Sequence, residues 1–107
     1  MADNKTFRAP AAGFSFGPVH PGELLGDELA VRELSANALA LKLRVPANRI
    51  TEIINGKRGI SAETALRLGR YLGTGAQFWM NLQAKFDLEI AEREIGAAIR
   101  REVEEAA

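Results

Sequence analysis

Hydrophobic residues recur along this chain at intervals of three and four, in short runs that begin and end at helix-capping residues. That spacing places them on one face of an α-helix. The first run follows His20, where Pro21 needs no backbone donor at the first helical position and Glu23 suits the positive end of the helix dipole. We therefore expect a helix to begin here, with an apolar face formed by Leu24, Leu25 and Leu29.

Two short helices are predicted next, separated by the tripeptide 44–46. Ser35 is a favourable N-cap for the first of them, whose inward residues are Leu39, Ala40 and Leu43. Pro46 cannot lie inside a continuing helix, so it marks a new start. Residues 47–54 then have one apolar face, formed by Ile50, Ile53 and Ile54. Asn55-Gly56 ends this helix, because glycine tolerates the left-handed conformation that often follows a helix.

Two longer helices follow in the pattern. Ser61 is a candidate N-cap for a fourth helix that Gly73 ends, with Ala65, Leu68 and Leu72 inward. The segment 74–77 matches a capping box, with Gln77 three residues after Thr74. It predicts a fifth helix whose inward residues are Phe78, Leu82 and Phe86, with Trp79 beside that face. We interpret these aromatic residues as core or dimer packing rather than as a ligand site.

A narrow apolar seam continues beyond Asp87, formed by Ala91, Ile95, Ile99 and Val103. It predicts an amphipathic helix that either folds back on the domain or contacts another chain. The expected organisation is an all-α chain with a flexible arm over 1–18, anchored by Phe14 and Phe16, a five-helix domain over 19–87 and an amphipathic helix over 88–107.

The link 44–46 is too short for the helices it joins to run antiparallel, so they must cross steeply, as in a helix-turn-helix. In that motif the N-terminal residues of the second helix enter the DNA major groove. With the isoleucines inward, the outward residues are Ala47, Asn48, Arg49, Thr51 and Glu52.

The chemistry of these outward residues suits base reading. Asparagine can bond adenine twice, arginine can do the same to guanine, glutamate accepts from cytosine, and a methyl group meets thymine. Asn48, Arg49 and Glu52 are the specificity candidates, although Glu52 fits a merely solvated position equally well. Phosphate contacts are expected from nearby basic residues, and the predicted DNA-binding set is completed by Lys42, Arg44, Asn55, Lys57 and Arg58.

The distribution of charge supports a nucleic-acid partner although the formal net charge is zero. Residues 35–75 carry seven basic and two acidic side chains, a net charge of +5. The flanking segments 1–34 and 76–107 carry −2 and −3. A basic middle between acidic ends is typical of a DNA reader whose other surfaces serve a different partner.

Other classes of function find little support. The chain has no cysteine, which excludes disulfides, thiolate zinc sites and cysteine nucleophiles. His20 with Glu23 lacks the further ligands of a zinc site, and no phosphate loop or nucleophile elbow occurs. We expect no enzyme activity, no metal and no cofactor. Since no segment resembles a signal peptide or a membrane span, a cytoplasmic protein is expected.

A family resemblance rests on the run LSANALALKLRVPANRITEIINGKRGISAETALRLGRYLGTGAQFWMNLQ. It resembles the XRE/Cro type of helix-turn-helix proteins. With the preceding HPGELL, the match over about Val19 to Glu94 is similar to HigA-type antitoxins, the virulence-associated protein I group. The resemblance implies a lambda-repressor-like domain, a homodimer on a palindromic operator, repression of its own operon, and a RelE-like (HigB-type) ribonuclease toxin as partner. One departure is Arg44, where the family usually has glycine.

Two other hypotheses fit the same residues. The first is a stand-alone or phage-type XRE repressor that has the same DNA chemistry and no toxin partner. The second is a helix-turn-helix domain that serves only protein association. A neighbouring gene for a small ribonuclease-like protein favours the antitoxin, and DNA affinity that survives loss of Asn48 and Arg49 favours the association domain.

Overall fold

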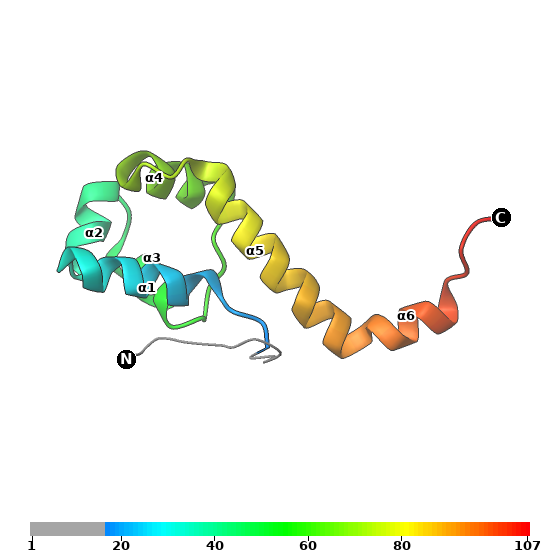
Figure 1. The fold of residues 1–107 in the computed structure, drawn as a ribbon. Coiled ribbons are helices and arrows are strands. Elements are labelled where there is room, and N and C mark those ends of the chain that lie inside the picture. Colours follow the sequence, from blue (N-terminus) through cyan, green and yellow to red (C-terminus); the bar gives the residue numbers. More distant parts are fainter. Residues whose placement is uncertain (1–16) are drawn as a thin grey trace.

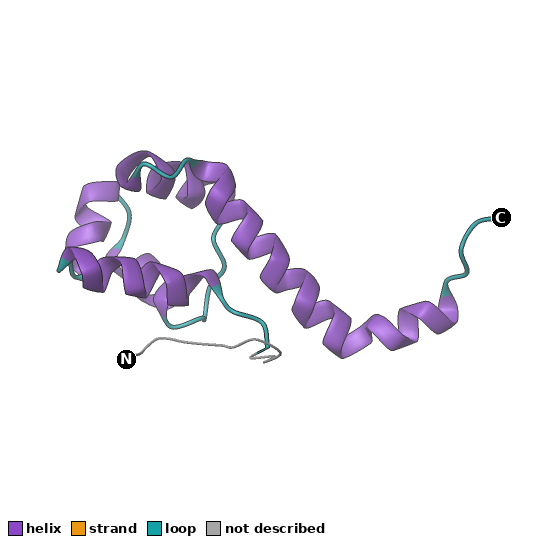
Figure 2. Ribbon diagram, in the orientation of Figure 1, coloured by secondary structure: helices purple, strands orange, loops and turns teal. Residues whose placement is uncertain are grey.

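The computed structural model describes residues 17–107 as a small helical bundle with a projecting helical arm (Figure 1). The elements are α1 (Pro21–Arg32), α2 (Ala36–Leu43), α3 (Ala47–Ile54), α4 (Ala62–Leu72), α5 (Ala76–Ala91), the π-helical turn η1 (Glu92–Gly96) and α6 (Ala97–Glu102). The described residues contain no strand, which confirms the all-α prediction (Figure 2). The expected arm with its anchors Phe14 and Phe16 lies outside this range, apart from Gly17 and Pro18.

Local capping sets the starts of the first, second and fourth helices. Pro21 is the first residue of α1, as predicted, and the His20 ring adds a cap because its Nδ1 accepts from the Gly22 N–H at 2.9 Å. Ser35 and Ser61 cap α2 and α4, each accepting a hydrogen bond from the backbone N–H three residues on. Both serine caps confirm the predictions.

The capping box predicted at Thr74 does not form. Helix α5 begins after Gly75, at φ 81°, with no side-chain cap. The Thr74 hydroxyl instead accepts a hydrogen bond from the indole N–H of Trp79 at 2.8 Å and donates one to the Gly75 carbonyl. A tertiary role for Thr74 therefore replaces the local one that the sequence indicated.

One hydrophobic core lies between α1, α2, α3, α4 and the start of α5. Its members are Leu25, Leu29, Leu39, Ala40, Leu43, Ile50, Ile53, Ile60, Ala65, Leu68, Leu72 and Trp79. Most of the predicted inward residues are among them. Leu24 is the exception on α1, because it is 37% exposed.

The predicted inward face of α5 is wrong by one residue at its start. Phe78 is 41% exposed, whereas Trp79 is 1% exposed and belongs to the core. The inward stripe therefore runs from Trp79 through Leu82 to Phe86, which are both partly buried. Four-residue spacing alone suggested Phe78, but the hydrogen bond from the indole to Thr74 lets the larger, polar-tipped side chain fill the core.

The helical arm formed by the end of α5, η1 and α6 leads away from the bundle (Figure 1). The principal contacts of η1 are with α5 and α6, and Ile95, Ile99 and Val103 are 51%, 45% and 65% exposed. The radius of gyration, 16.5 Å, exceeds the roughly 13 Å of a compact chain of this length. The apolar seam thus does not fold back on the bundle. No described helix combines the length and hydropathy needed to cross a bilayer.

Candidate DNA-binding surface

Helices α2 and α3 are separate and are joined by the tight turn that the sequence predicted. Arg44 ends α2 in the left-handed conformation, with φ 62° and ψ 46°. The Val45 N–H then donates to the Ala40 carbonyl at 3.0 Å, which closes the helix end. Pro46 lies in an extended conformation and precedes the first residue of α3. The result is the helix-turn-helix arrangement expected from the link 44–46.

The two sides of α3 differ sharply in burial. Ile50 and Ile53 are completely buried, and Ile54 packs against the core from a partly buried position. On the other side Ala47, Asn48 and Thr51 are exposed, while Arg49 and Glu52 are half-buried. This confirms the predicted division of faces, and it leaves a polar surface on the N-terminal half of α3.

Helix α3 is held by close contact between its Ile53 carbonyl and the start of α1. A Cβ atom at Gly22 would overlap the carbonyl of Ile53, so only glycine lets the two helices approach this closely. Nothing in the sequence pattern predicts this contact. It matters because a rigid support sets the position of the side chains on the opposite, polar face of α3.

The loop after α3 holds two further predicted residues in exposed positions. Gly56, at φ 75°, turns the chain, and Lys57 and Arg58 follow it. The loop is anchored by Ile60, which is buried and whose N–H donates to Gln83 Oε1 at 2.7 Å. Gln83, on α5, therefore positions this basic loop, a role that the sequence pattern does not reveal because the partners are 23 positions apart.

Two carboxylates near α3, Glu52 and Glu63, lie beside arginines. Glu52 Oε1 accepts from Arg58 Nε at 2.8 Å, and Arg49 Nη1 lies 3.9 Å from Glu63 Oε1. Glu63 Oε2 also accepts from Arg67 Nε at 3.0 Å. Glu63 was not among the predicted site residues, because it lies in the next helix and only the fold brings it to Arg49.

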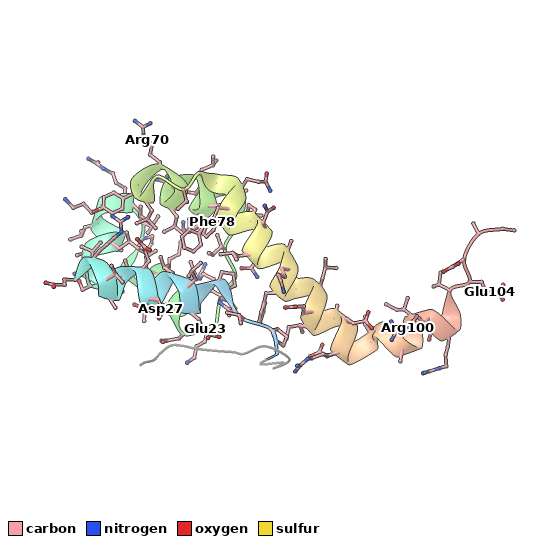
Figure 3. The ribbon with its side chains drawn as sticks, in the orientation of Figure 1. Glu23, Asp27, Arg70, Phe78, Arg100 and Glu104 are labelled. Atoms are coloured by element: carbon pink, nitrogen blue, oxygen red, sulfur yellow. The ribbon has the colours of Figure 1, made fainter. Side chains whose placement is uncertain are left out.

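The remaining predicted residues surround the helix-turn-helix. Lys42 and Arg44 are exposed at the end of α2, and Asn55 is exposed at the end of α3. Arg67, on α4, supports the turn between α2 and α3, because its Nη1 donates to the Leu43 carbonyl at 2.9 Å. Arg70, by contrast, projects from α4 into solvent (Figure 3).

His20 serves the fold rather than a metal. It is 8% exposed, caps α1, and packs edge-on against the Phe86 ring with 4.9 Å between centroids. Within residues 17–107 no group of three or more His, Cys, Asp or Glu side chains is placed to hold a metal ion. The chemistry of this surface is that of hydrogen bonding and charge.

Comparison with known proteins identifies the family. The family model described as Helix-turn-helix matches residues 31–79, which include all of α2, α3 and α4. Virulence-associated protein I of Dichelobacter nodosus is 49% identical over 86 residues, which cover 79% of this chain and 80% of that protein. This chain belongs to the XRE-type helix-turn-helix family.

Within the XRE-type family the chain lies in the group of HigA-type antitoxins, as its motifs indicated. Pseudomonas aeruginosa antitoxin HigA, solved with the higBA promoter, matches with a TM-score of 0.82 and 47% identity. That match covers 84% of this chain and 99% of the HigA chain. The Escherichia coli protein YbaQ, an uncharacterized HTH-type transcriptional regulator, is 40% identical over 72 residues, or 66% of this chain and 64% of YbaQ. HigA is an antitoxin and YbaQ a transcriptional regulator, in agreement with the prediction that the chain is not an enzyme.

Proposed function

We propose that this protein is a DNA-binding antitoxin that represses its own operon and neutralises a RelE-like (HigB-type) ribonuclease toxin. The observation that carries the DNA-binding part is the exposed polar surface on the N-terminal half of α3, opposite two completely buried isoleucines. A HigA antitoxin of the same fold has been solved with its promoter. The major groove admits an α-helix, so α3 is the element that enters it.

Two groups of side chains make different contacts with DNA, one with bases and the other with phosphates. Asn48, Arg49 and Thr51, with Ala47 and Glu52, face the base edges and give sequence preference. The second group lies around them and binds phosphate, which positions the protein without reading sequence: Lys42, Arg44, Asn55, Lys57 and Arg58. A homodimer presents two copies of α3 to a palindromic operator, with half-sites one helical turn apart, or roughly 34–36 Å.

The DNA-binding proposal is tested by replacing Asn48 and Arg49 together with alanine. Each base contact contributes about 1–3 kcal/mol of discrimination, so the double variant should lose at least ten-fold in affinity for the protein's own promoter. Fluorescence anisotropy with labelled duplexes measures the loss. Since both side chains lie on the outer face of α3, the thermal melting temperature should stay the same.

Arg70→Ala is the matched control for that experiment. It also removes a basic side chain, but one that projects from α4 into solvent (Figure 3). Its affinity for the promoter should remain close to that of the unmodified protein. Unchanged promoter affinity in the Asn48/Arg49 double variant would favour a domain used only for protein association.

The toxin part of the proposal is tested separately. Co-expression with the product of the adjacent gene should relieve growth inhibition by that product and yield a stable complex in a pull-down. YbaQ, at 40% identity, is described as an uncharacterized HTH-type transcriptional regulator and not as an antitoxin, which supports the alternative of a stand-alone XRE repressor. Promoter binding without any effect on the neighbouring product's toxicity would establish that alternative.

A further inference from the structure

The basic middle of the chain contains only two acidic residues, and both contact arginines at the proposed DNA surface. Between residues 35 and 75 these are Glu52 and Glu63. Arg58 places both Nε and Nη2 at 2.8 Å from Glu52 Oε1. Arg49 places Nη1 at 3.9 Å from Glu63 Oε1, an ion pair without a hydrogen bond, while Glu63 Oε2 accepts from Arg67 Nε at 3.0 Å. No other carboxylate in this segment opposes its attraction to DNA.

A paired arginine contributes less to general DNA binding than a free one. Non-specific affinity comes from basic groups that neutralise phosphates and release counterions. The Arg58–Glu52 pair adds no net charge, and Glu63 offsets one of the two charges of Arg49 and Arg67. Moving either arginine to a phosphate leaves its carboxylate facing a polyanion. The two pairs therefore lower the affinity for DNA of arbitrary sequence.

Operator DNA can replace the broken ion pairs with hydrogen bonds to base edges. Guanine presents two acceptors that match the guanidinium fork of Arg49. The amino group of the paired cytosine is a donor that a glutamate such as Glu52 can accept from. Exposed ion pairs are weak enough to open for such contacts. The balance between closed and open pairs thus depends on the sequence beneath α3.

We propose that Glu52 and Glu63 are positioning residues that hold Arg58 and Arg49 away from non-specific DNA and so raise the selectivity for the operator. This inference rests on the proposed function, because it requires α3 to face DNA. Glu63 also lies in the first turn of α4, where a carboxylate favours the helix. The test must therefore separate selectivity from helix stability.

The experiment measures the binding of Glu52→Gln and Glu63→Gln variants to the protein's own promoter and to a random-sequence duplex over a range of salt concentrations. Affinity for random DNA should rise about two- to ten-fold for each variant, with a salt slope steeper by about 0.9. Affinity for the promoter should rise less, so that the ratio of promoter affinity to random-DNA affinity falls. A helix-stabilising role alone would not change the salt slope.

Glu92→Gln is the matched control, because Glu92 accepts from Arg100 Nη1 at 2.6 Å in the C-terminal arm. Glu92→Gln changes the net charge by the same amount, but at a position away from α3. It should alter neither the affinity for the promoter nor the affinity for random DNA. Glu52→Gln should also have a smaller effect in an Arg58→Gln background, since the carboxylate then has no arginine to hold. An equal effect in both backgrounds would contradict the pairing.

Three results would overturn the proposal. They are unchanged affinity and salt slope on random DNA, equal increases on both duplexes, and loss of promoter binding with random binding unchanged. The last would show that the carboxylates contribute only to operator contacts and do not hold the arginines away from DNA of arbitrary sequence. If the unmodified protein itself fails to prefer its promoter over random DNA, the proposed function fails first, and this result is seen before any variant is compared.

Discussion

At the scale of single residues, Arg44 combines a conformational cost with a useful charge. Its φ of 62° lies in the left-handed region, which costs a non-glycine residue roughly 1–2 kcal/mol. The same residue is exposed at the turn between α2 and α3, where we propose that it binds a phosphate of the DNA backbone. The family resemblance pointed to this position, because it places glycine where this chain has Arg44.

Replacing Arg44 with glycine should therefore separate stability from binding. The free energy of unfolding should rise by about 1 kcal/mol in urea denaturation, because glycine adopts the conformation without strain. Affinity for the promoter should fall, and the salt slope should decrease by about 0.9. Arg44→Ala loses the same charge but keeps the strain, so it should bind as weakly without the gain in stability. Equal stability of the two variants would argue against strain at this turn.

Trp79 shows where residue patterns mislead. The spacing of Phe78, Leu82 and Phe86 predicted that Phe78 is inward, but the core contains Trp79 instead. The deciding contact is the hydrogen bond from the indole to Thr74, which depends on the turn before α5. Helical periodicity fixes the faces of a helix only after its start is known, and here the start was predicted from a capping box that does not form.

Trp79→Ala should accordingly destabilise the protein far more than Phe78→Ala. Loss of a buried tryptophan costs about 3–5 kcal/mol, which for a domain of this size leaves little net stability. The partly exposed Phe78 should cost less than about 1.5 kcal/mol. Thermal or urea denaturation of the two variants measures the difference. A larger effect from Phe78→Ala would reverse the assignment of the faces.

At the scale of helices and turns, the sequence predicted what local chemistry decides. Ser35 and Ser61 cap helices through contacts three residues away, so their roles are visible in the sequence. Gln83 and Glu63 were missed, because each acts on a residue of another element. The approach of α1 to α3 at Gly22 belongs to the same class, since a glycine inside a predicted helix looks like an ordinary weak point.

Two glycines of α1 offer a direct test of that approach. Gly22→Ala should destabilise the protein by more than 1 kcal/mol, because the added Cβ would overlap the Ile53 carbonyl and displace α3. Gly26→Ala should be neutral or stabilising by up to about 1 kcal/mol, since its Cβ would lie 3.6 Å from an Ile54 methyl group in ordinary contact. Denaturation curves measure both. Similar stabilities of the two variants would contradict the close packing at Gly22.

At the scale of the whole molecule, the chain separates a basic bundle from a more acidic arm. The segment with a net charge of +5 contains α2, α3 and α4, while residues 76–107 carry −3. The seam of Ile95, Ile99 and Val103 remains exposed on the arm. The direction of the arm could not be predicted from the sequence, because an apolar seam fits packing on the bundle and contact with another chain equally well.

Entry of α3 into the major groove is tested most directly by site-specific cross-linking of the protein to its own promoter. The chain has no cysteine, so a single photo-reactive label can be attached at Thr51→Cys on α3 or, as a control, at Leu88→Cys, where the side chain is 71% exposed. The label at position 51 should cross-link to bases in two half-sites roughly 34–36 Å apart, and the label at position 88 should not. Bound promoter that cross-links from position 88 but not from position 51 would contradict the claim that α3 enters the major groove.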